Sequence, residues 1–291
     1  MTYSDEICSF QWKSKFPNFE LINLEVQCSQ KLNWRFSQSS LYLHLMNLFY
    51  HFGKYIQWLG QVFKRPENWS MYWKETMRQM NSIGIGSLAI IAIIAVFIGA
   101  VTAVQFSYQM GGSLIPRYYI GYIVRDMTII ELAPTFSCMV LAGKVGSNIA
   151  SEIGGMRQKE HIDAMEIMGV NTAAYLVQPK IIAAMVVIPM LVCLAAFISV
   201  IGGYIAVVPT GSFSSTEYIQ GLRSFFLPYN IFMMFVKAFT FAFLLTTISC
   251  YQGYFVKGGS IELGNASTQA VVYSNILILL SDYFIAMILT G

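Results

Sequence analysis

Residues 83–106, IGIGSLAIIAIIAVFIGAVTAVQF, form an unbroken run without a charged side chain. A helix needs about 20 apolar residues to cross the roughly 30 Å hydrocarbon core of a bilayer, and this run is long enough. The whole chain of 291 residues is 56% hydrophobic, with a mean hydropathy of +0.56. A soluble domain of that length cannot bury so much apolar surface. The run therefore predicts an integral membrane protein.

Four further segments have the length and hydropathy of membrane-spanning helices, and they comprise residues 120–143, 181–208, 231–250 and 270–289. Unlike the first run, three of them carry charge within their apolar stretches. Glu131 lies in the second span, Lys237 in the fourth and Asp282 in the fifth. Pro134 also lies in the second span and predicts a kink there. The expected fold is all-α, with five transmembrane helices.

An amphipathic helix is predicted before the first span. Between Leu45 and Phe63 apolar side chains recur at spacings of three and four, with polar side chains on the opposite face. Tyr50, Tyr55 and Trp58 lie along this segment, and such aromatic rings favour the headgroup layer of a membrane. We expect the helix to lie in the membrane interface, because no soluble domain follows on which it could pack.

The chain divides into three regions on this basis. Residues 1–45 show no periodicity and have no assigned role, and Met46 is an alternative start that would make them an artefact. Residues 46–80 hold the interfacial helix and its connector, and residues 81–291 hold the membrane domain. The first thirty residues contain no apolar stretch, so no cleavable leader is expected.

Lysine and arginine are distributed unevenly between the two sides of the membrane. If the amino terminus faces the cytoplasm, ten of them from residue 46 onward lie on the cytoplasmic side: Lys54, Lys64, Arg65, Lys74, Arg78, Lys144, Arg157, Lys159, Lys180 and Lys257. Three lie on the other side: Arg117, Arg125 and Arg223. Cytoplasmic loops carry the excess of positive charge. The bias therefore predicts a cytoplasmic amino terminus and a cytoplasmic loop between the second and third spans.

That loop, residues 141–170, reads LAGKVGSNIASEIGGMRQKEHIDAMEIMGV and is the only dense block of charge between two apolar halves. It predicts one short helix, which Ser147 or Ser151 would cap and Gly169 would end. The apolar edge of this helix comprises Ile153, Met156, Ile162, Met165 and Met168, and the charged edge comprises Arg157, Lys159, Glu160, Asp163 and Glu166. Such a helix suits contact with a cytoplasmic partner. An ordinary solvated helix without a partner is the alternative.

Charges inside spans need a physical reason. A charged side chain at the bilayer centre costs about 2.5–3.5 kcal/mol on insertion scales, so it normally faces the bundle interior or a water-filled cavity. Lys237 between Glu131 and Asp282 predicts an ion-pair tie that joins the second, fourth and fifth spans. The tie is either structural or a latch beside a substrate cavity, and the sequence favours neither strongly.

Small side chains recur every four residues in the first span, at Ala95, Gly99 and Ala103. Such a stripe lets another helix approach closely. A homodimer seam and an internal contact both fit, and internal packing is the simpler expectation.

Several function classes lack their sequence signatures. The chain contains no GxxxxGK[ST] phosphate loop, no HExxH or GxSxG motif and no CxxC pair. No catalytic residue, metal site or directly bound cofactor is therefore predicted. The net charge of +3 is small and the basic residues are scattered, so a nucleic-acid partner is not expected.

One known family shares many of these features in the same order. From Glu131 the chain reads ELAP, followed by LAGKVGSNIASEIGGM, by Glu160 and Asp163 and by AMEIMGV. Further matches are Pro179-Lys180, Gly202-Gly203-Tyr204, Lys237, Gly253-Tyr254 and Asp282. These motifs resemble the MlaE family of ABC-transporter permeases, which is similar to chloroplast inner-envelope lipid permeases, and the resemblance covers about residues 46–291. Many members have an arginine directly before the glutamate, whereas this chain has Ile130 and, nearby, Arg125.

The resemblance implies a permease homodimer in a bacterial inner membrane, with a plastid inner envelope as the less favoured location. It also implies two cytoplasmic ABC ATPase subunits that use ATP, MCE-domain lipid-binding proteins outside, and phospholipid transport that maintains outer-membrane lipid asymmetry. A coupling helix would contact the ATPase through Glu152, Gly154, Met156, Arg157, Glu160, Asp163, Glu166 and Gly169. The intramembrane residues near the lipid cavity would be Glu131, Lys237 and Asp282.

Two rival classes remain beside a transporter subunit. An integral-membrane lipid-modifying enzyme would need a nucleophile or an acid-base pair at the interface, and the sequence offers none. A structural membrane scaffold would need neither charged residues in its spans nor a charged cytoplasmic helix, and both are expected here.

Overall fold

A computed structural model describes residues 53–63, 69–110, 118–209 and 214–290. The chain forms two compact units, Met1–Gln57 and Trp58–Gly291, and the membrane-spanning helices all belong to the second. The predicted extension at residues 1–45 and the first turns of the predicted amphipathic helix lie outside the described residues.

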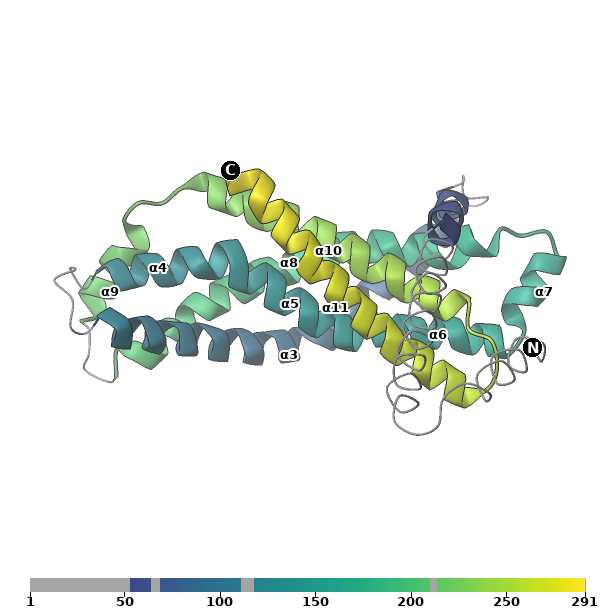
Figure 1. Cartoon of the computed structure of the whole chain (residues 1–291), viewed down its shortest axis with the longest axis horizontal. Coiled ribbons are helices and arrows are strands. Elements are labelled where there is room, and N and C mark those ends of the chain that lie inside the picture. Colours follow the sequence, from purple (N-terminus) through teal and green to yellow (C-terminus); the bar gives the residue numbers. More distant parts are fainter. Residues whose placement is uncertain (1–52, 64–68, 111–117, 210–213, 291) are drawn as a thin grey trace, which may run out of the picture. The chain divides into compact units, whose positions relative to one another are not determined.

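Every regular element in the described residues is helical (Figure 1). Five described segments are long and apolar enough to cross a membrane. The first is α3 (Trp69–Met110), and the second combines α4 (Tyr119–Met127), η1 (Thr128–Leu132), α5 (Ala133–Leu141), η2 (Ala142–Gly146) and α6 (Ser147–Gln158). The others are α8 (Thr172–Val207), α10 (Pro228–Tyr254) and α11 (Ser260–Thr290), with α7 (His161–Ile167) and α9 (Ser215–Arg223) as short connectors. The predicted all-α fold with five spans is confirmed.

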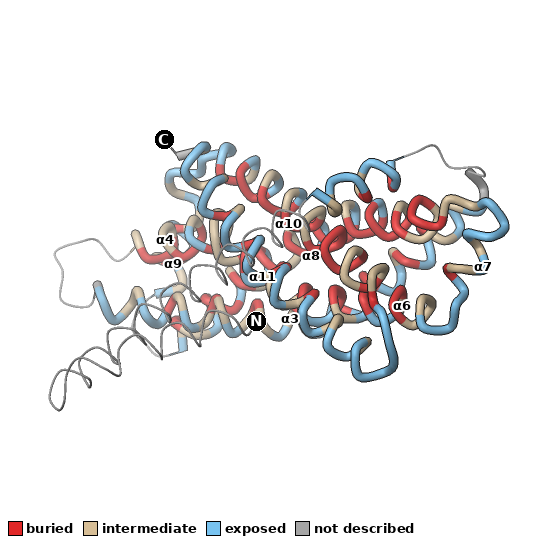
Figure 2. Tube along the Cα trace, turned by 45° about the vertical axis from the view of Figure 1, so that its right-hand side comes forward, coloured by how far each residue is buried: buried red, intermediate tan, exposed pale blue. Residues whose placement is uncertain are grey.

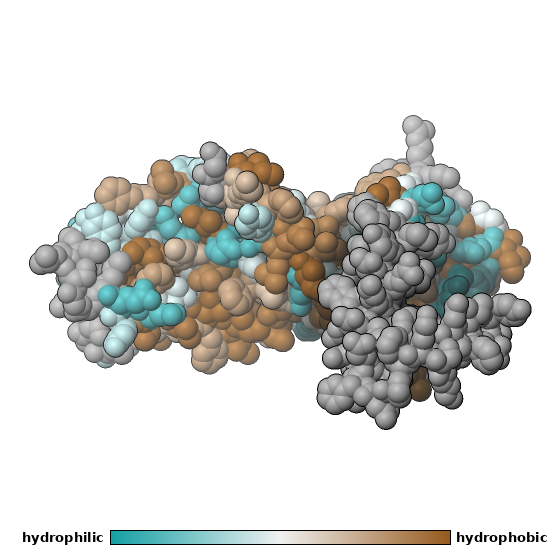
Figure 3. All heavy atoms as spheres, viewed as in Figure 1, coloured by the Kyte–Doolittle hydropathy of each residue, from teal (hydrophilic) through white to brown (hydrophobic). Residues whose placement is uncertain are grey.

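Burial differs among the spans (Figure 2). In their most apolar stretches, α8 and α10 have 56% of residues buried, whereas α3 has 28% and α11 has 17%. α8 and α10 are therefore central, and α3 and α11 present apolar side chains outward. Phe97 on α3 and Phe284 on α11 are 66% and 51% exposed, and hydrophobic residues cover much of the spanning helices in Figure 3. Apolar surface of this extent is stable against lipid or another protein.

The small-residue stripe of α3 is an internal contact with α8. A Cβ atom on Gly99 would lie 1.8 Å from the Ser199 carbonyl oxygen, and one on Gly202 would lie 2.4 Å from that of Val96. The two backbones therefore touch, which only glycine permits at these positions. Ala95 and Ala103 on the same stripe are 4% and 0% exposed. The expected internal packing is confirmed.

The second span is one continuous helix from Tyr119 to Gln158 that contains two wide π turns. The first, η1, ends directly before α5, in which Pro134 occupies the first turn. Proline has no N–H to donate to the preceding turn, and a π turn absorbs that loss. The irregularity predicted at Pro134 is thus present as a π segment, and it contains Glu131. The second, η2, contains Lys144.

The predicted amphipathic helix is described at residues 53–62. Trp58 and Val62, one turn apart, are 3% and 0% exposed. The Trp58 ring packs with centroid distances of 5.7 Å to Tyr251 and 5.9 Å to Tyr254 at the end of α10. Trp58 therefore packs against the aromatic rings at the end of a spanning helix, where a large ring gains from ring contacts. The position of this helix in the membrane interface stays a prediction.

The cytoplasmic loop does not form the single capped helix that its sequence predicts. α6 continues from the second span, so neither Ser147 nor Ser151 caps a helix start; the Ser147 hydroxyl instead donates to the Gly143 carbonyl at 2.5 Å. The helix ends at Gln158, and Glu160 adopts a left-handed φ of 59° before α7 begins. Two short helices therefore replace one.

The end of α7 and the start of α8 follow local capping rules. Gly169 has a φ of +80°, and the Val170 N–H donates to the Met165 carbonyl at 3.2 Å, as in a left-handed helix stop. This predicted stop is confirmed. Asn171 then caps α8, because its side chain accepts from the Ala174 N–H at 3.3 Å. The third span consequently begins at Thr172, well before the predicted boundary at residue 181.

Candidate functional site

An intramembrane charge cluster joins three spans. Lys237 of α10 places its Nζ atom 2.6 Å from Glu131 Oε2 of η1 and 2.7 Å from Asp282 Oδ1 of α11. The Thr135 hydroxyl donates to the other Asp282 oxygen at 3.3 Å. The ion-pair tie predicted between the second, fourth and fifth spans is present.

Exposure within this cluster is unequal. The Lys237 side chain is 0% exposed and that of Asp282 is 11% exposed, whereas that of Glu131 is 44% exposed. The lysine neutralises one of the two carboxylates, so the cluster carries a formal excess of one negative charge. The accessible group is therefore a carboxylate, which suits an amine or hydroxyl donor better than an anion.

Three of the eight predicted coupling residues bind one another. Arg157 Nη1 lies 2.8 Å from Asp163 Oδ1 and 3.8 Å from Glu166 Oε1, which pulls α7 back toward α6. The Tyr254 hydroxyl donates to Glu166 Oε1 at 2.8 Å, and the Thr172 hydroxyl donates to the same oxygen at 3.2 Å. These side chains fix the position of α7 against α8 and α10.

Other predicted coupling residues hold α6 in place, and one of them ends α7. Glu152 Oε2 lies 2.5 Å from Nζ of Lys180 on α8, and the Lys180 side chain is only 3% exposed. A Cβ atom on Gly154 would lie 2.4 Å from Leu263 Cδ1, so this glycine permits close packing on α11. Met156 is half-buried, and Gly169 ends α7.

Exposed side chains of the segment include residues at both ends of α7. Glu160 is exposed at the left-handed turn, and Ile167 and Met168 at the other end of α7 are 87% and 70% exposed. We call these three residues the α7 tip. Ile167 was not among the predicted contact residues, although its five-residue spacing from the buried Ile162 places it on the opposite face of a helix. Met168 was predicted on the apolar edge with Ile162, and the structure separates them.

Arg125 has a role at the α4–α9 end of the bundle that was not predicted from the sequence. Its Nη1 donates to the carbonyls of Leu222 at 2.6 Å and Ser224 at 2.9 Å, and its Nη2 donates to that of Phe225 at 3.2 Å. Asp126 Oδ1 balances its charge at 2.8 Å. Arg125 therefore binds the carbonyl-rich end of α9 instead of substituting for an arginine beside Glu131.

α9 is held from its other face by Tyr218. The Tyr218 hydroxyl donates to the Val200 carbonyl at 3.2 Å, and burial raises the pKa of this side chain to about 12. A Cβ atom on Gly221 would lie 2.0 Å from the Tyr118 carbonyl oxygen, so α9 lies directly against the start of α4. The described residues of α4 and α9 are thus closely packed.

The five apolar spans and the ion-paired cluster within them define a polytopic membrane protein. The sequence profile described as Permease MlaE matches residues 76–288. The chain belongs to the MlaE permease family.

Named relatives are consistent with this membership. A probable ABC transporter permease protein of Rickettsia bellii is 38% identical over 215 residues, which cover 74% of this chain and 83% of the relative. The intermembrane phospholipid transport system permease protein MlaE of Haemophilus influenzae is 28% identical, over 74% of this chain and 82% of the relative. The Arabidopsis thaliana protein TRIGALACTOSYLDIACYLGLYCEROL 1, chloroplastic, is 26% identical, over 78% and 65%. The chain is thus a transmembrane permease, and its relatives are transporter subunits and not catalysts.

Proposed function

We propose that this permease moves phospholipids between membranes, with ATP hydrolysed by a separate ATPase subunit. The observation that carries the proposal is membership of the MlaE family, which includes a relative named for intermembrane phospholipid transport. The relatives named ABC transporter permeases support the ATPase, because a permease of that class works with one. The ATP is bound by that partner.

The α7 tip is the part of the chain that contacts the ATPase in this proposal. Ile167 and Met168 are the most exposed apolar side chains of the segment, and Glu160 is exposed at the turn before the opposite end of α7. Exposed apolar side chains with a charged rim are typical of a protein contact. The ion pairs of Arg157 hold the tip rigid, so force applied there moves α6 and the second span.

The lipid passes through a cavity between two copies of the permease in the cytoplasmic membrane of a bacterium, and an MCE-domain protein receives or delivers it outside. The exposed apolar faces of α3 and α11 support this arrangement, because they are long enough to line a lipid path. Glu131 supports it too, since its half-open carboxylate offers an acceptor at membrane depth. The charge cluster then has both a structural and a substrate-facing side.

The test uses the permease co-expressed with its ATPase and reconstituted into vesicles that contain a fluorescent phospholipid. Replacing both tip side chains, Ile167→Ser with Met168→Ser, should lower ATPase co-purification and lipid transport more than about tenfold, the loss of a small interface hot spot. Ile261→Ser is the matched control, because Ile261 is 80% exposed at the start of α11 and outside the tip. Unchanged transport in the tip variant would refute the docking role. A wild-type complex that hydrolyses ATP without moving phospholipid would refute the proposal that phospholipid is the transported substrate.

A further inference from the structure

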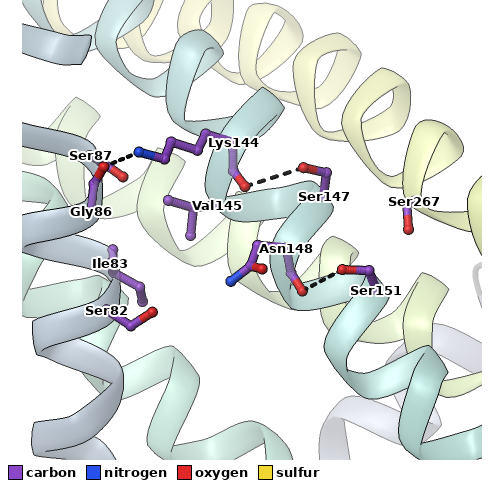
Figure 4. A pocket seen from close by; sticks show the side chains of 10 residues that line it. All are labelled: Ser82, Ile83, Gly86, Ser87, Lys144, Val145, Ser147, Asn148, Ser151 and Ser267. Carbon is purple, nitrogen blue, oxygen red and sulfur yellow. Dashed lines mark hydrogen bonds between the residues drawn. The ribbon is translucent and has the colours of Figure 1, made fainter. Parts of the chain in front are cut away.

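A polar cleft of about 550 Å³ lies between α3, the η2–α6 segment and α11 (Figure 4). α3 and α11 both pack against η2, and the cleft opens beside that contact. Its polar lining includes Ser82 and Ser87 of α3, Lys144 and Asn148 of the second span, and Ser267 of α11. These polar groups, in a bundle with apolar outer faces, suit an occupant that carries both polar and apolar parts.

Lys144 is the cation of this cleft, and it differs from the buried cations of the bundle. Arg125, Lys180 and Lys237 each have a carboxylate within 2.8 Å. Lys144 is exposed, and no carboxylate of the described residues lies within ion-pair distance of it. It stands on the wide turn η2, and π turns occur frequently at functional sites.

The Lys144 ammonium is hydrogen-bonded to the α3 side of the cleft. It donates to the carbonyl of Gly86, and Figure 4 shows its side chain reaching from the second span toward Gly86 and Ser87 of α3. An ammonium has three donors, so two remain for an anion. The positive charge is therefore fixed at the edge of the cleft and is not neutralised by the described residues.

The position of the cleft along the bundle is at the cytoplasmic headgroup layer. Gly86 lies three residues inside the apolar run that begins at Ile83, which is about 5 Å along a helix axis. The Lys and Arg bias places that end of α3 at the cytoplasmic side. The cleft therefore lies at the edge of the hydrocarbon core, and a lysine side chain there can extend toward the lipid phosphates in the adjoining headgroup layer.

The remaining polar groups of the cleft offer acceptors to a headgroup and one neutral donor to its phosphate. Ser147, Ser151 and Ser267 donate their hydroxyl protons to backbone carbonyls of their own helices, at 2.5, 3.0 and 3.0 Å. Their oxygens are left as acceptors, which suit the hydroxyl or amine of a headgroup. The Asn148 amide faces the cleft as a neutral donor beside the Lys144 ammonium. Charge-assisted bonds to phosphate oxygens are the strongest that these groups can make.

We propose that this cleft binds the phosphate group of a phospholipid from the cytoplasmic leaflet, with Lys144 as the cationic ligand and Asn148 as a neutral donor. The volume is within the usual range for ligand sites, roughly 300–1,000 Å³. The site lies apart from the Glu131–Lys237–Asp282 cluster, whose lysine is buried and whose accessible group is the carboxyl of Glu131. The proposal rests on the proposed function, because the ligand is the transported phospholipid at the cytoplasmic end of its path.

The experiment uses the permease–ATPase complex in vesicles of phosphatidylethanolamine and phosphatidylglycerol that contain a phospholipid with a photoreactive group on its glycerol. After irradiation, mass spectrometry maps the labelled peptides. Wild-type protein should be labelled within residues 82–87 and 144–151. Lys144→Met should lower this labelling about tenfold, as expected for one charge-assisted bond. Lys144→Arg should retain it.

Two further variants separate binding from folding. Lys257→Met is the matched control, because Lys257 is an exposed cytoplasmic lysine outside the cleft lining, and its labelling should equal that of the wild type. Asn148→Leu should lower labelling by a smaller factor, about threefold, without touching the Lys144–Gly86 contact. Wild-type labelling in both Lys144→Met and Asn148→Leu would overturn the proposal.

A competition arm identifies the source of the phosphate, and a transport arm separates the two proposals. Inorganic phosphate at millimolar concentration should leave the labelling unchanged, and full displacement would assign the cleft to a soluble phosphate compound instead. Phospholipid transport is measured in the same vesicles. Transport by the wild type with no labelling of the cleft overturns the site alone. Labelling of the cleft with no transport overturns the proposed function and leaves the phosphate site standing.

Discussion

Replacing Lys237 with methionine tests whether the charge cluster holds the bundle together. Methionine preserves the length of the side chain and removes its charge, which leaves Asp282, 11% exposed, without its cation. Removing one partner of a buried pair costs about 3–5 kcal/mol, because the other charge stays buried. Glu131 contributes less to this cost, since its side chain is 44% exposed and remains partly solvated. We expect a loss near the lower end, about 3 kcal/mol.

The measurement is thermal stability of the detergent-solubilised protein, followed as the loss of the monodisperse gel-filtration peak after heating. A loss of about 3 kcal/mol should lower the midpoint by roughly 6–12 °C for a domain of this size. The double variant Lys237→Met with Asp282→Asn should recover most of the loss, because the asparagine oxygen can still accept from the Thr135 hydroxyl. Lys237→Met with Glu131→Gln should recover less.

The order of the two double variants is the decisive result. If the single variant melts with the wild type, the cluster contributes nothing to stability and the reasoning from burial is wrong. If Glu131→Gln rescues better than Asp282→Asn, the relative burial of the two carboxylates in the folded protein is not what the structure shows. Retained stability with lost transport would assign Lys237 to the substrate path instead.

Three other predictions concern packing, the non-cytoplasmic end and pH. Gly99→Ala should prevent the α3–α8 contact and cost at least about 3 kcal/mol, whereas Gly155→Ala, with open space around it, should be neutral or stabilising in the same thermal assay. Arg125→Met should free the end of α9 and increase protease cleavage within residues 214–227, while cleavage elsewhere stays constant. Burial raises the pKa of Tyr218 from its ordinary value of 10.0 to about 12, so the folded state keeps a proton that the unfolded state loses between these values. Stability should therefore fall as pH rises from 10 to 12, and Tyr218→Phe should show a smaller fall over that range by chemical denaturation.

Much of the fold could be predicted because membrane spans obey a length rule. The run at residues 83–106 and its four counterparts needed only apolar length, and the structure keeps all five. The pairing of Lys237 with Glu131 and Asp282 followed from the cost of isolated charge in lipid. Local capping residues were less decisive: Gly169 ends α7, but Ser147 caps nothing, because α6 is continuous with the second span. Capping preferences act over one turn, and the continuity of a helix depends on packing further away.

The contacts of functional side chains could not be predicted from the sequence where a side chain had more than one possible partner. Arg157, Asp163 and Glu166 have the charge of a docking surface, yet the structure pairs them with one another and leaves Ile167 and Met168 outside. A sequence pattern shows which side chains share a helix face, and it does not show that the helix breaks at residue 160. Once that break is present, the faces before and after it are no longer aligned. The residues of the predicted charged edge therefore form ion pairs within the chain, and the apolar side chains of the α7 tip are exposed instead.

The described bundle holds two kinds of cation: those that are ion-paired and stabilise the fold, and one that is available to a ligand. Arg125, Lys180 and Lys237 have side chains between 0% and 6% exposed, and each has a carboxylate, as the cost of burying a lone charge requires. Lys144 lies in the same bundle on a wide turn, open to a polar cleft, with a backbone carbonyl as its described partner. A cation contributes most to the stability of a fold when its anion belongs to the same chain, because that anion is always present. A cation contributes most to the binding of a ligand when the ligand itself supplies the anion. Lys144 fits the second case, and α6 connects its turn directly to the segment that carries the α7 tip.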